Sequence, residues 1–361
     1  MKIYRFFLSV AIIVIAFQVS AQHNKSEYKT HWHNAPVSQG KTGTCWCFAT
    51  ISFLESEVYL KTGKEIRFSE MFIVYWEYVE RAKAFVKNRG DVYFAEGSEA
   101  TSVIRMVNKY GIVPLSAYSG KAGGQELHNH SVMFKEMDNF LKHIARTDTW
   151  NIDLVTSTIK DILNHYMGEP PEKFNYKGTY FTPRDFTDKI LELKPIDYFS
   201  FMSTMSLPYN QKGELVEADN WWHCDDYYNV SVDDFYWIIR NSLREGYSVC
   251  LCGDVSEPGF KKTVEAGTIP SFDIPYDAID KYSREFRLNN KTTTDDHCMH
   301  IVGYLDKGEM GWFLLKDSGA GGFKGPNKGY RFIREDYIKL KMMNIMVYKE
   351  GARKVLDQII K

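Results

Sequence analysis

Hydrophobic positions at helical spacing mark the first third of the chain. In residues 45–62 the apolar side chains recur every three or four positions, which predicts a helix, and Gly63 suits its C-terminal end. Ser69 is a suitable N-cap for a second helix. Residues 97–98 precede a third helix that we expect to end near Tyr110.

Beyond about residue 245 the pattern changes to short alternating or apolar runs separated by glycines. These runs predict strands of an antiparallel sheet, and they read "SVCLCGDV", "HCMHIVGYL", "GWFLLKDS", "GYRFIRE" and "NIMVYKE". The intervening segment, about 120–245, is polar and aromatic-rich and is predicted to be a mostly helical insertion. Helices first and strands last indicate an α+β protein in which an N-terminal helical lobe faces a C-terminal antiparallel β lobe, with a cleft between them as the natural place for a site.

The first 21 residues have the pattern of a secretory signal peptide. Lys2 and Arg5 make a basic start, and an apolar run leads to the small residues before Gln22. We expect cleavage near Ala21-Gln22, a single mature domain over residues 22–361, and a periplasmic or secreted location. The apolar run is short for a membrane span, so no stable membrane insertion is expected. Losing two basic residues changes the formal net charge from −1 to −3, which gives no reason to expect nucleic-acid binding.

The six cysteines do not form an obvious disulfide framework. An exported chain of this length does not need one, and the pairs one residue apart (45/47 and 250/252) are poorly placed to bridge each other. We therefore interpret most of the cysteines as small buried hydrophobic residues, with Cys250 and Cys252 packing on one face of a strand.

One cysteine has the surroundings of a nucleophile. Cys45 stands where a helix begins, and the partial positive charge of a helix N-terminus favours a thiolate there, whereas Cys47 lies inside the apolar helix. His297, at the start of a predicted strand, is a candidate general base, and Asp317, at the end of the next strand, could orient it. Gln39 could supply an oxyanion-hole donor.

Three other interpretations compete with this one. The Cys-Trp-Cys stretch could be a redox pair, although dithiol motifs usually have two intervening residues and a thioredoxin-like context. A zinc site could recruit a set of histidines and cysteines, but residues 297 and 300 point to opposite faces of a strand. That set is His223, Cys224, His297, Cys298 and His300. The third interpretation is a non-catalytic binding protein of the same fold, which would more often have lost Cys45 or His297.

The same motifs resemble those of papain-like cysteine peptidases. "QGKTGTCWCFA" is similar to the family's Q-G-x-C-G-S-C-W-A-F, "DHCMHIVGY" to its histidine strand, and "LLKDSGAG" to its K-N-S-W-G. The resemblance implies a papain-like fold, peptide substrates, no cofactor and no metal ion. It makes Cys45 the nucleophile, His297 the base and then acid, Asp317 the orienting residue, and Gln39 part of the oxyanion hole. It also implies substrate-binding positions at Gly97, Ser98, Trp46, Asp296 and Cys298.

Further segments resemble the bleomycin hydrolase and aminopeptidase C branch. The 252 residues from Cys45 to His297 exceed the roughly 130–150 of the ordinary cathepsin pattern, which fits the long insertion of this branch. "ADNWWHCDDYYNVSVDDF" is similar to its D-N-W segment. The resemblance implies an aminopeptidase. Members form hexamers, so a homo-oligomer is left open.

Three departures from the family are visible. Asp317 replaces asparagine, from which we expect an altered pH profile, with an inactive site as the alternative, and Gly319 stands where tryptophan is usual. Thr42 replaces the first cysteine of the papain disulfide. The branch's tail ends in the cleft, where its carboxylate holds the substrate amine, but the last twelve residues here predict one short helix. Endopeptidase or dipeptidyl cleavage therefore remains an alternative.

Overall fold

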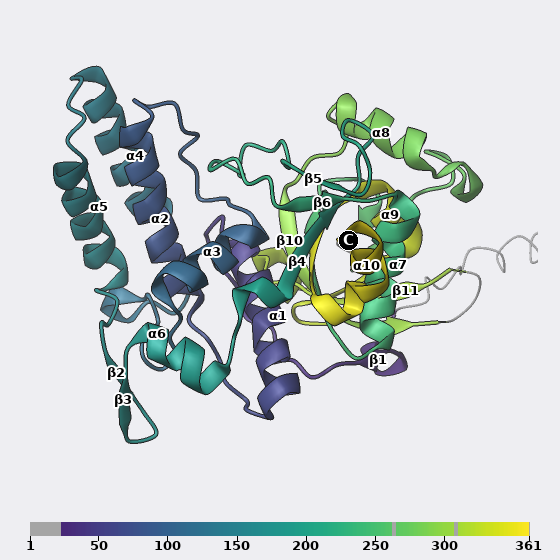
Figure 1. Cartoon of the computed structure of the whole chain (residues 1–361), viewed down its shortest axis with the longest axis horizontal. Coiled ribbons are helices and arrows are strands. Elements are labelled where there is room, and N and C mark those ends of the chain that lie inside the picture. The colour runs from purple at the N-terminus through teal and green to yellow at the C-terminus, as the bar shows by residue number, and fades with distance from the viewer. Residues whose placement is uncertain (1–22, 262–264, 307–309, 361) are drawn as a thin grey trace, which may run out of the picture.

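The computed structural model describes residues 23–261, 265–306 and 310–360, so the predicted signal peptide lies outside the described residues. Figure 1 shows helices α2, α4 and α5 on one side and a sheet with helices α7, α9 and α10 on the other. The predicted α+β class, with a helical lobe facing a sheet lobe, is confirmed. No helix among the described residues is both long and apolar enough to span a membrane.

The first three helices begin and end at the signals read from the sequence. They are α1 (Cys45–Thr62), α2 (Glu70–Lys87) and α3 (Ala100–Tyr110). Gly63 ends α1 in the left-handed conformation with φ 68°, which a residue without a Cβ adopts at little cost. The Ser69 side chain accepts a hydrogen bond from the Phe72 N–H and so caps α2.

The helical lobe is extended by the first half of the predicted insertion. Its helices are α4 (Ser131–Arg146), α5 (Ile152–Met167) and α6 (Pro183–Phe186), and a hairpin of β2 (Phe174–Tyr176) and β3 (Thr179–Phe181) lies between α5 and α6. Buried apolar side chains of α2, α4 and α5 belong to one continuous core that also includes α1 and α3.

The sheet lobe is built mainly from antiparallel strands. The five predicted runs form β7 (Val249–Gly253), β10 (His297–Leu305), β11 (Trp312–Lys316), β12 (Tyr330–Arg334) and β13 (Met342–Tyr348). Neighbouring strands lie in the order β13-β7-β10-β11-β12, and β1 (Lys29–Thr30) pairs with β10. Beyond β12 lie β9 (Ala266–Gly267), which pairs parallel to it, and β8 (Phe260–Lys261).

The second half of the segment 120–245 differs from the mostly helical prediction. It contributes β4 (Tyr198–Met202), β5 (Gln211–Gly213) and β6 (Tyr227–Asn229) to the main sheet, followed by α7 (Val232–Arg244). Strand β4 pairs with β13, far away in the sequence, and β6 pairs parallel to β4. The parts of this segment that form β4 and β6 are short strands, which are stabilised by pairing with distant strands and so cannot be recognised from a local pattern.

Alternate residues of the central strands face different helices. Cys250, Cys252, Cys298 and Met346 join the core of the helical lobe, whereas their neighbours in sequence join a second core. That second core includes side chains of α7, α9 (Glu335–Lys341) and α10 (Arg353–Ile359), and the helix α8 (Lys281–Asn289) contacts α9. Helix α1 therefore covers one face of the sheet, and α7, α9 and α10 cover the other.

The interpretation of Cys252 as a packing residue is wrong, because it forms a disulfide with Cys298. Strands β7 and β10 are antiparallel neighbours whose register places Cys252 directly opposite Cys298, with Cα atoms 4.1 Å apart. Directly opposed residues of neighbouring antiparallel strands come close enough for such a bond. The two cysteines lie 46 residues apart in the sequence, so their pairing depends on the register between two strands and is not visible in a local pattern.

Candidate active site

The two neighbouring thiols at the start of α1 have different surroundings. Cys45 is the first residue of the helix and is partly exposed, whereas Cys47 is fully buried. The Cys47 Sγ donates to the Glu70 carbonyl oxygen at 3.2 Å. Burial raises the pKa of Cys47 well above its ordinary value, so this thiol stays protonated. Only Cys45 combines access with a helix N-terminus.

His297 and Asp317 meet at adjacent ends of β10 and β11. His297 Nε2 lies 2.8 Å from Asp317 Oδ1. Burial lowers the pKa of His297, but the negative charge of Cys45, the hydrogen bonds with Asp317 and Cys45, and the charge of Asp317 together raise it well above the ordinary value. The structure thus brings Cys45, His297 and Asp317 into one interacting row that favours an imidazolium beside a thiolate.

The carboxylate of Asp317 has a dedicated set of partners. Its Oδ1 also accepts from the Gly319 N–H at 2.7 Å, and its Oδ2 lies 3.3 Å from Nε of the buried Arg331. Burial raises the pKa of Asp317, but the His297 hydrogen bond and charge, the Gly319 N–H and the Arg331 charge lower it more. A Cβ on Gly322 would lie 2.9 Å from Oδ2, so the backbone closes around the carboxylate.

Arg331 was missed by the sequence analysis. It lies on β12 opposite Leu315 of β11, two residues before Asp317. An arginine in the strand after "FLLKDS" was visible in the sequence, but its reach to Asp317 depends on the register between the two strands.

Gln39 is positioned by the residue that follows Asp317. The Ser318 hydroxyl donates to Gln39 Oε1 at 2.7 Å, and the Gln39 N–H donates to the Ser318 carbonyl at 2.8 Å. Gln39 Nε2 donates one hydrogen to the Thr42 carbonyl at 2.6 Å, in the loop before Cys45. Its second N–H can serve an oxyanion. The turn after β11 therefore orients both His297 and Gln39.

The expected substrate-binding residues Gly97 and Ser98 lie beside residues 40–44, which precede Cys45 and which we call the Cys45 loop. The Gly43 N–H donates to the Glu96 carboxylate at 2.8 Å, and Trp46 Nε1 donates to the Glu96 carbonyl at 3.1 Å. Trp46 is buried, so it supports the backbone next to Gly97 and is not itself open to a substrate. Residues 97–98, which we call the substrate edge, are thereby fixed relative to the helix that carries Cys45.

The other two expected substrate-binding residues have different surroundings. Asp296 is exposed, and its Oδ1 accepts from the Val255 N–H at 2.9 Å. Cys298 is buried and bonded to Cys252.

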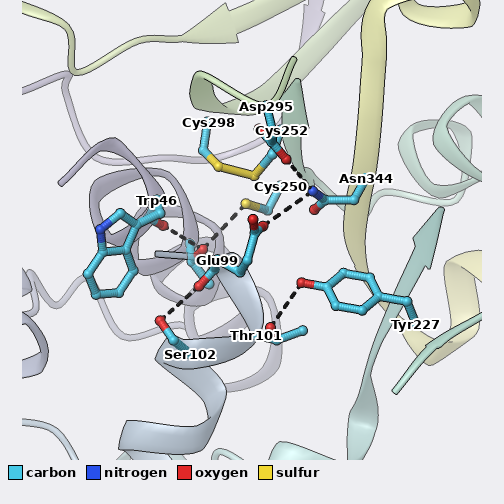
Figure 2. The surroundings of a disulfide bond; sticks show 11 residues. Trp46, Glu99, Thr101, Ser102, Tyr227, Cys250, Cys252, Asp295, Cys298 and Asn344 are labelled. Carbon is cyan, nitrogen blue, oxygen red and sulfur yellow. Dashed lines mark hydrogen bonds between the residues drawn. A yellow bond between two sulfur atoms is a disulfide. The ribbon is translucent and has the colours of Figure 1, made fainter. Parts of the chain in front are cut away.

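Two buried or partly buried carboxyl groups near the disulfide, Glu99 and Asp295, were not predicted from the sequence. Figure 2 shows Asn344 between Glu99 and Asp295, close to the Cys252–Cys298 bond. Asn344 Nδ2 lies 2.7 Å from Asp295 Oδ2 and 3.3 Å from Glu99 Oε2. Burial and neighbouring carboxylates raise the pKa of Glu99 to about 8 and that of Asp295 well above its ordinary value.

Within the described ranges, no group of three or more histidine, cysteine, aspartate or glutamate side chains is arranged to hold a metal ion.

Comparisons with known proteins agree with this geometry. The model of the Peptidase C1-like family matches residues 11–360. Aminopeptidase C of Lactobacillus delbrueckii subsp. lactis is 23% identical, with 89% of this chain and 82% of the relative covered. Aminopeptidase C of Listeria monocytogenes is 22% identical, with coverage of 88% and 81%. The crystal structure of PepW from Lactobacillus rhamnosis has a TM-score of 0.73 at 18% identity and covers 98% of this chain and 91% of that one, which confirms the papain-like fold.

Proposed function

The chain belongs to the Peptidase C1-like family, in its papain-like aminopeptidase C branch, and on this premise we propose that it is an aminopeptidase acting through Cys45. The observation that carries the proposal is the row of Cys45, His297 and Asp317 at the meeting point of α1, β10 and β11. A partly exposed thiol at a helix N-terminus next to an imidazole that is mostly shielded from solvent is the arrangement that nucleophilic catalysis needs.

The proposed reaction runs through an acyl-enzyme. The Cys45 thiolate attacks the peptide carbonyl, and the oxyanion receives the free N–H of Gln39 Nε2 and the Cys45 backbone N–H. The His297 imidazolium gives its proton to the leaving amine, which departs with the C-terminal part of the substrate. His297 then takes a proton from water, which hydrolyses the thioester and frees the thiolate.

The nucleophile can be tested by mapping an epoxide thiol inhibitor on the protein. We expect one adduct, on Cys45, and no adduct after Cys45→Ala. Cys47→Ala is the matched control and should label normally, because the buried, protonated Cys47 thiol takes no part. Labelling of Cys47 in place of Cys45 would contradict the assignment. Labelling of Cys45 with no peptide hydrolysis would favour a non-catalytic binding protein on this scaffold.

The choice between an aminopeptidase and its alternatives depends on the substrate's N-terminus. We expect fluorogenic amides of single amino acids with a free amine to be hydrolysed, and the N-acetylated forms to be cut far more slowly. Equal cleavage of blocked peptides would favour an endopeptidase instead. Release of dipeptides from a free N-terminus would favour a dipeptidyl peptidase.

We further propose that the protein is exported. The basic, apolar and small-residue order of residues 1–21 supports this proposal, and so does the Cys252–Cys298 disulfide, because such bonds persist in oxidising compartments. Cell fractionation with N-terminal sequencing should find a mature chain that begins near Gln22 outside the cytoplasm. A chain that keeps residues 1–21 and stays with a cytoplasmic marker would contradict export.

A further inference from the structure

A short segment between β5 and β6, residues 215–224, has a fixed shape, and we call it the strap. The buried side chain of Asn220 closes it on itself. Asn220 Nδ2 donates to the carbonyl oxygens of Leu215 and Cys224, each at 3.0 Å, and Asn220 Oδ1 accepts from the Cys224 N–H at 2.9 Å. With each of these polar atoms paired, the strap can act as a rigid wall.

The strap and the substrate edge are fastened to the same buried carboxylate on α2. Trp221 Nε1 donates to Glu77 Oε1 at 2.7 Å, and the Ser98 hydroxyl donates to the same oxygen at 2.8 Å. Arg105 Nη2 pairs with the other oxygen of Glu77 at 2.7 Å. The strap therefore lies directly on residues 97–98, the edge that adjoins the Cys45 loop.

Asp219 of the strap occupies the space next to Gly97. A Cβ placed on Gly97 would lie 2.0 Å from Asp219 Oδ2 and 2.6 Å from its Cγ. The partly exposed carboxylate thus lies against the backbone of the substrate edge, within reach of a peptide paired with that edge. Any residue larger than glycine at position 97 would displace this carboxylate.

A buried arginine is directed at Asp219 from beneath the edge. Arg81 Nη2 lies 3.8 Å from Asp219 Oδ1, and Nη1 donates to the carbonyls of Ala95 and Gly97, the latter at 2.6 Å. Arg81 is fully buried, and its Nε and Nη2 make no hydrogen bond among the described residues. This guanidinium holds the carboxylate of Asp219 at the edge and balances one negative charge.

Other carboxyl groups lie close enough to Asp219 to interact with its charge. The charges of Glu99, Glu217, Asp219 and Cys45 all act on Asp295. Besides burial, the charges of Asp219 and Glu217 are the main causes that raise the pKa of Glu99 to about 8. A cation placed among these groups would relieve their mutual repulsion.

We propose that the strap makes the enzyme an exopeptidase, and that the partly exposed Asp219 receives the free ammonium of the substrate's first residue. The inference rests on the proposed aminopeptidase function and names the residues that would set its specificity. On this proposal, a substrate with one residue before the scissile bond directs its ammonium at Asp219. A longer or N-acetylated substrate meets the strap and places a neutral group against that carboxylate.

The charge alone would also suit a substrate with a basic side chain one residue further from the scissile bond. That substrate must extend along residues 97–98, where the Asp219 carboxylate already lies. The occlusion therefore selects the N-terminal ammonium over an internal lysine or arginine.

The test compares Asp219→Asn and Asp219→Ala with the wild type on three amides of one fluorophore. The acyl groups are alanyl with a free amine, N-acetylalanyl, and propionyl, which lacks the amine. We expect Asp219→Asn to lower kcat/KM for the free-amine substrate roughly ten- to hundredfold, because a hydrogen bond to a charged group is lost. The same variant should leave kcat/KM for the propionyl substrate unchanged. Asp219→Ala should in addition admit N-acetylated or dipeptidyl substrates.

The matched control is Asp225→Asn, which makes the same change at an exposed residue just outside the strap and should preserve all three rates. The rate of Cys45 alkylation by iodoacetamide needs no ammonium and reports whether each variant is folded. An unchanged ratio of free-amine to propionyl hydrolysis in variants that alkylate normally would overturn the role of Asp219. A wild type that does not hydrolyse free-amine substrates would instead overturn the proposed function itself.

Discussion

At the scale of single residues, the aspartate at position 317 is accommodated by its neighbours. An asparagine in its place would have no net charge to pair with His297, whereas Asp317 contacts His297 through one oxygen and the buried Arg331 through the other. Arg331 offsets part of the cost of burying this carboxylate, since its charge helps to lower the pKa of Asp317. The substitution that departs from the family motif is therefore part of a matched group.

This group predicts the pH profile of Asp317→Asn. The pKa of His297 is raised in part by Asp317, and protonated His297 is the acid that the proposed reaction needs. Removing the carboxylate charge should lower the His297 pKa, so the basic limb of kcat/KM should move to lower pH by about one unit or more. The measurement is kcat/KM against pH for the wild type and the variant.

The control is Asp273→Asn, which removes a carboxylate paired with Arg287 at 2.9 Å on another part of the surface. Its profile should match that of the wild type. A basic limb that stays in place in Asp317→Asn would show that the carboxylate does not govern His297.

At the scale of elements, the disulfide joins β10, which carries His297, to its neighbour β7. Cys298 follows His297 on β10, and Cys252 precedes Gly253, the residue opposite His297 on β7. The bond closes a loop with a sequence separation of 46 residues. The loop contains α8 and the start of β10, so a link across it restricts the unfolded chain considerably.

We expect Cys252→Ser/Cys298→Ser to be less stable by about 4 kcal/mol, from the loop-closure entropy of a link of this length. The measurement is the free energy of unfolding by urea, with and without a reductant. The wild type should fall to the level of the double variant when reduced, and the double variant should not respond. Cys224→Ser, at a free and partly exposed cysteine, is the control and should respond to reductant like the wild type.

The elements also show how far a local pattern can predict this fold. Helices α1 to α3 and strands β7, β10, β11, β12 and β13 carry their own period and caps, so the sequence predicted them. Strands β4 and β6 have three to five residues and depend on β13 and on each other. The Cys252–Cys298 bond, the Arg331–Asp317 contact and the position of Asp219 on Gly97 all depend on register or loop placement, which arises only in the folded molecule.

At the scale of the whole molecule, α1 joins the two lobes through a buried polar group. The Ser52 hydroxyl lies 2.8 Å from His300 Nδ1 on β10 and accepts from Lys316 Nζ on β11 at 2.7 Å. Glu55, one turn further along α1, is buried and accepts from the Phe68 N–H and from Asn34. This contact fixes the helix that carries Cys45 against the strands that carry His297 and Asp317.

Glu55 and Lys316 offset each other's charge across this contact. Burial raises the pKa of Glu55, and Lys316 opposes that rise; burial lowers the pKa of Lys316 to about 8, and Glu55 opposes that fall. Removing either partner leaves the other charge buried with less compensation.

We therefore expect Lys316→Met to lower the free energy of unfolding by about 3 kcal/mol, and Glu55→Gln/Lys316→Met to recover part of that loss. The measurement is a double-mutant cycle from urea unfolding, followed in parallel by far-UV circular dichroism, which is dominated by the helices, and by the alkylation rate of Cys45. If α1 holds the lobes together, both signals should change at the same urea concentration in every variant. Strictly additive losses would show that the two charges are independent, and an earlier change at Cys45 in the wild type would show that the site opens before the lobes unfold.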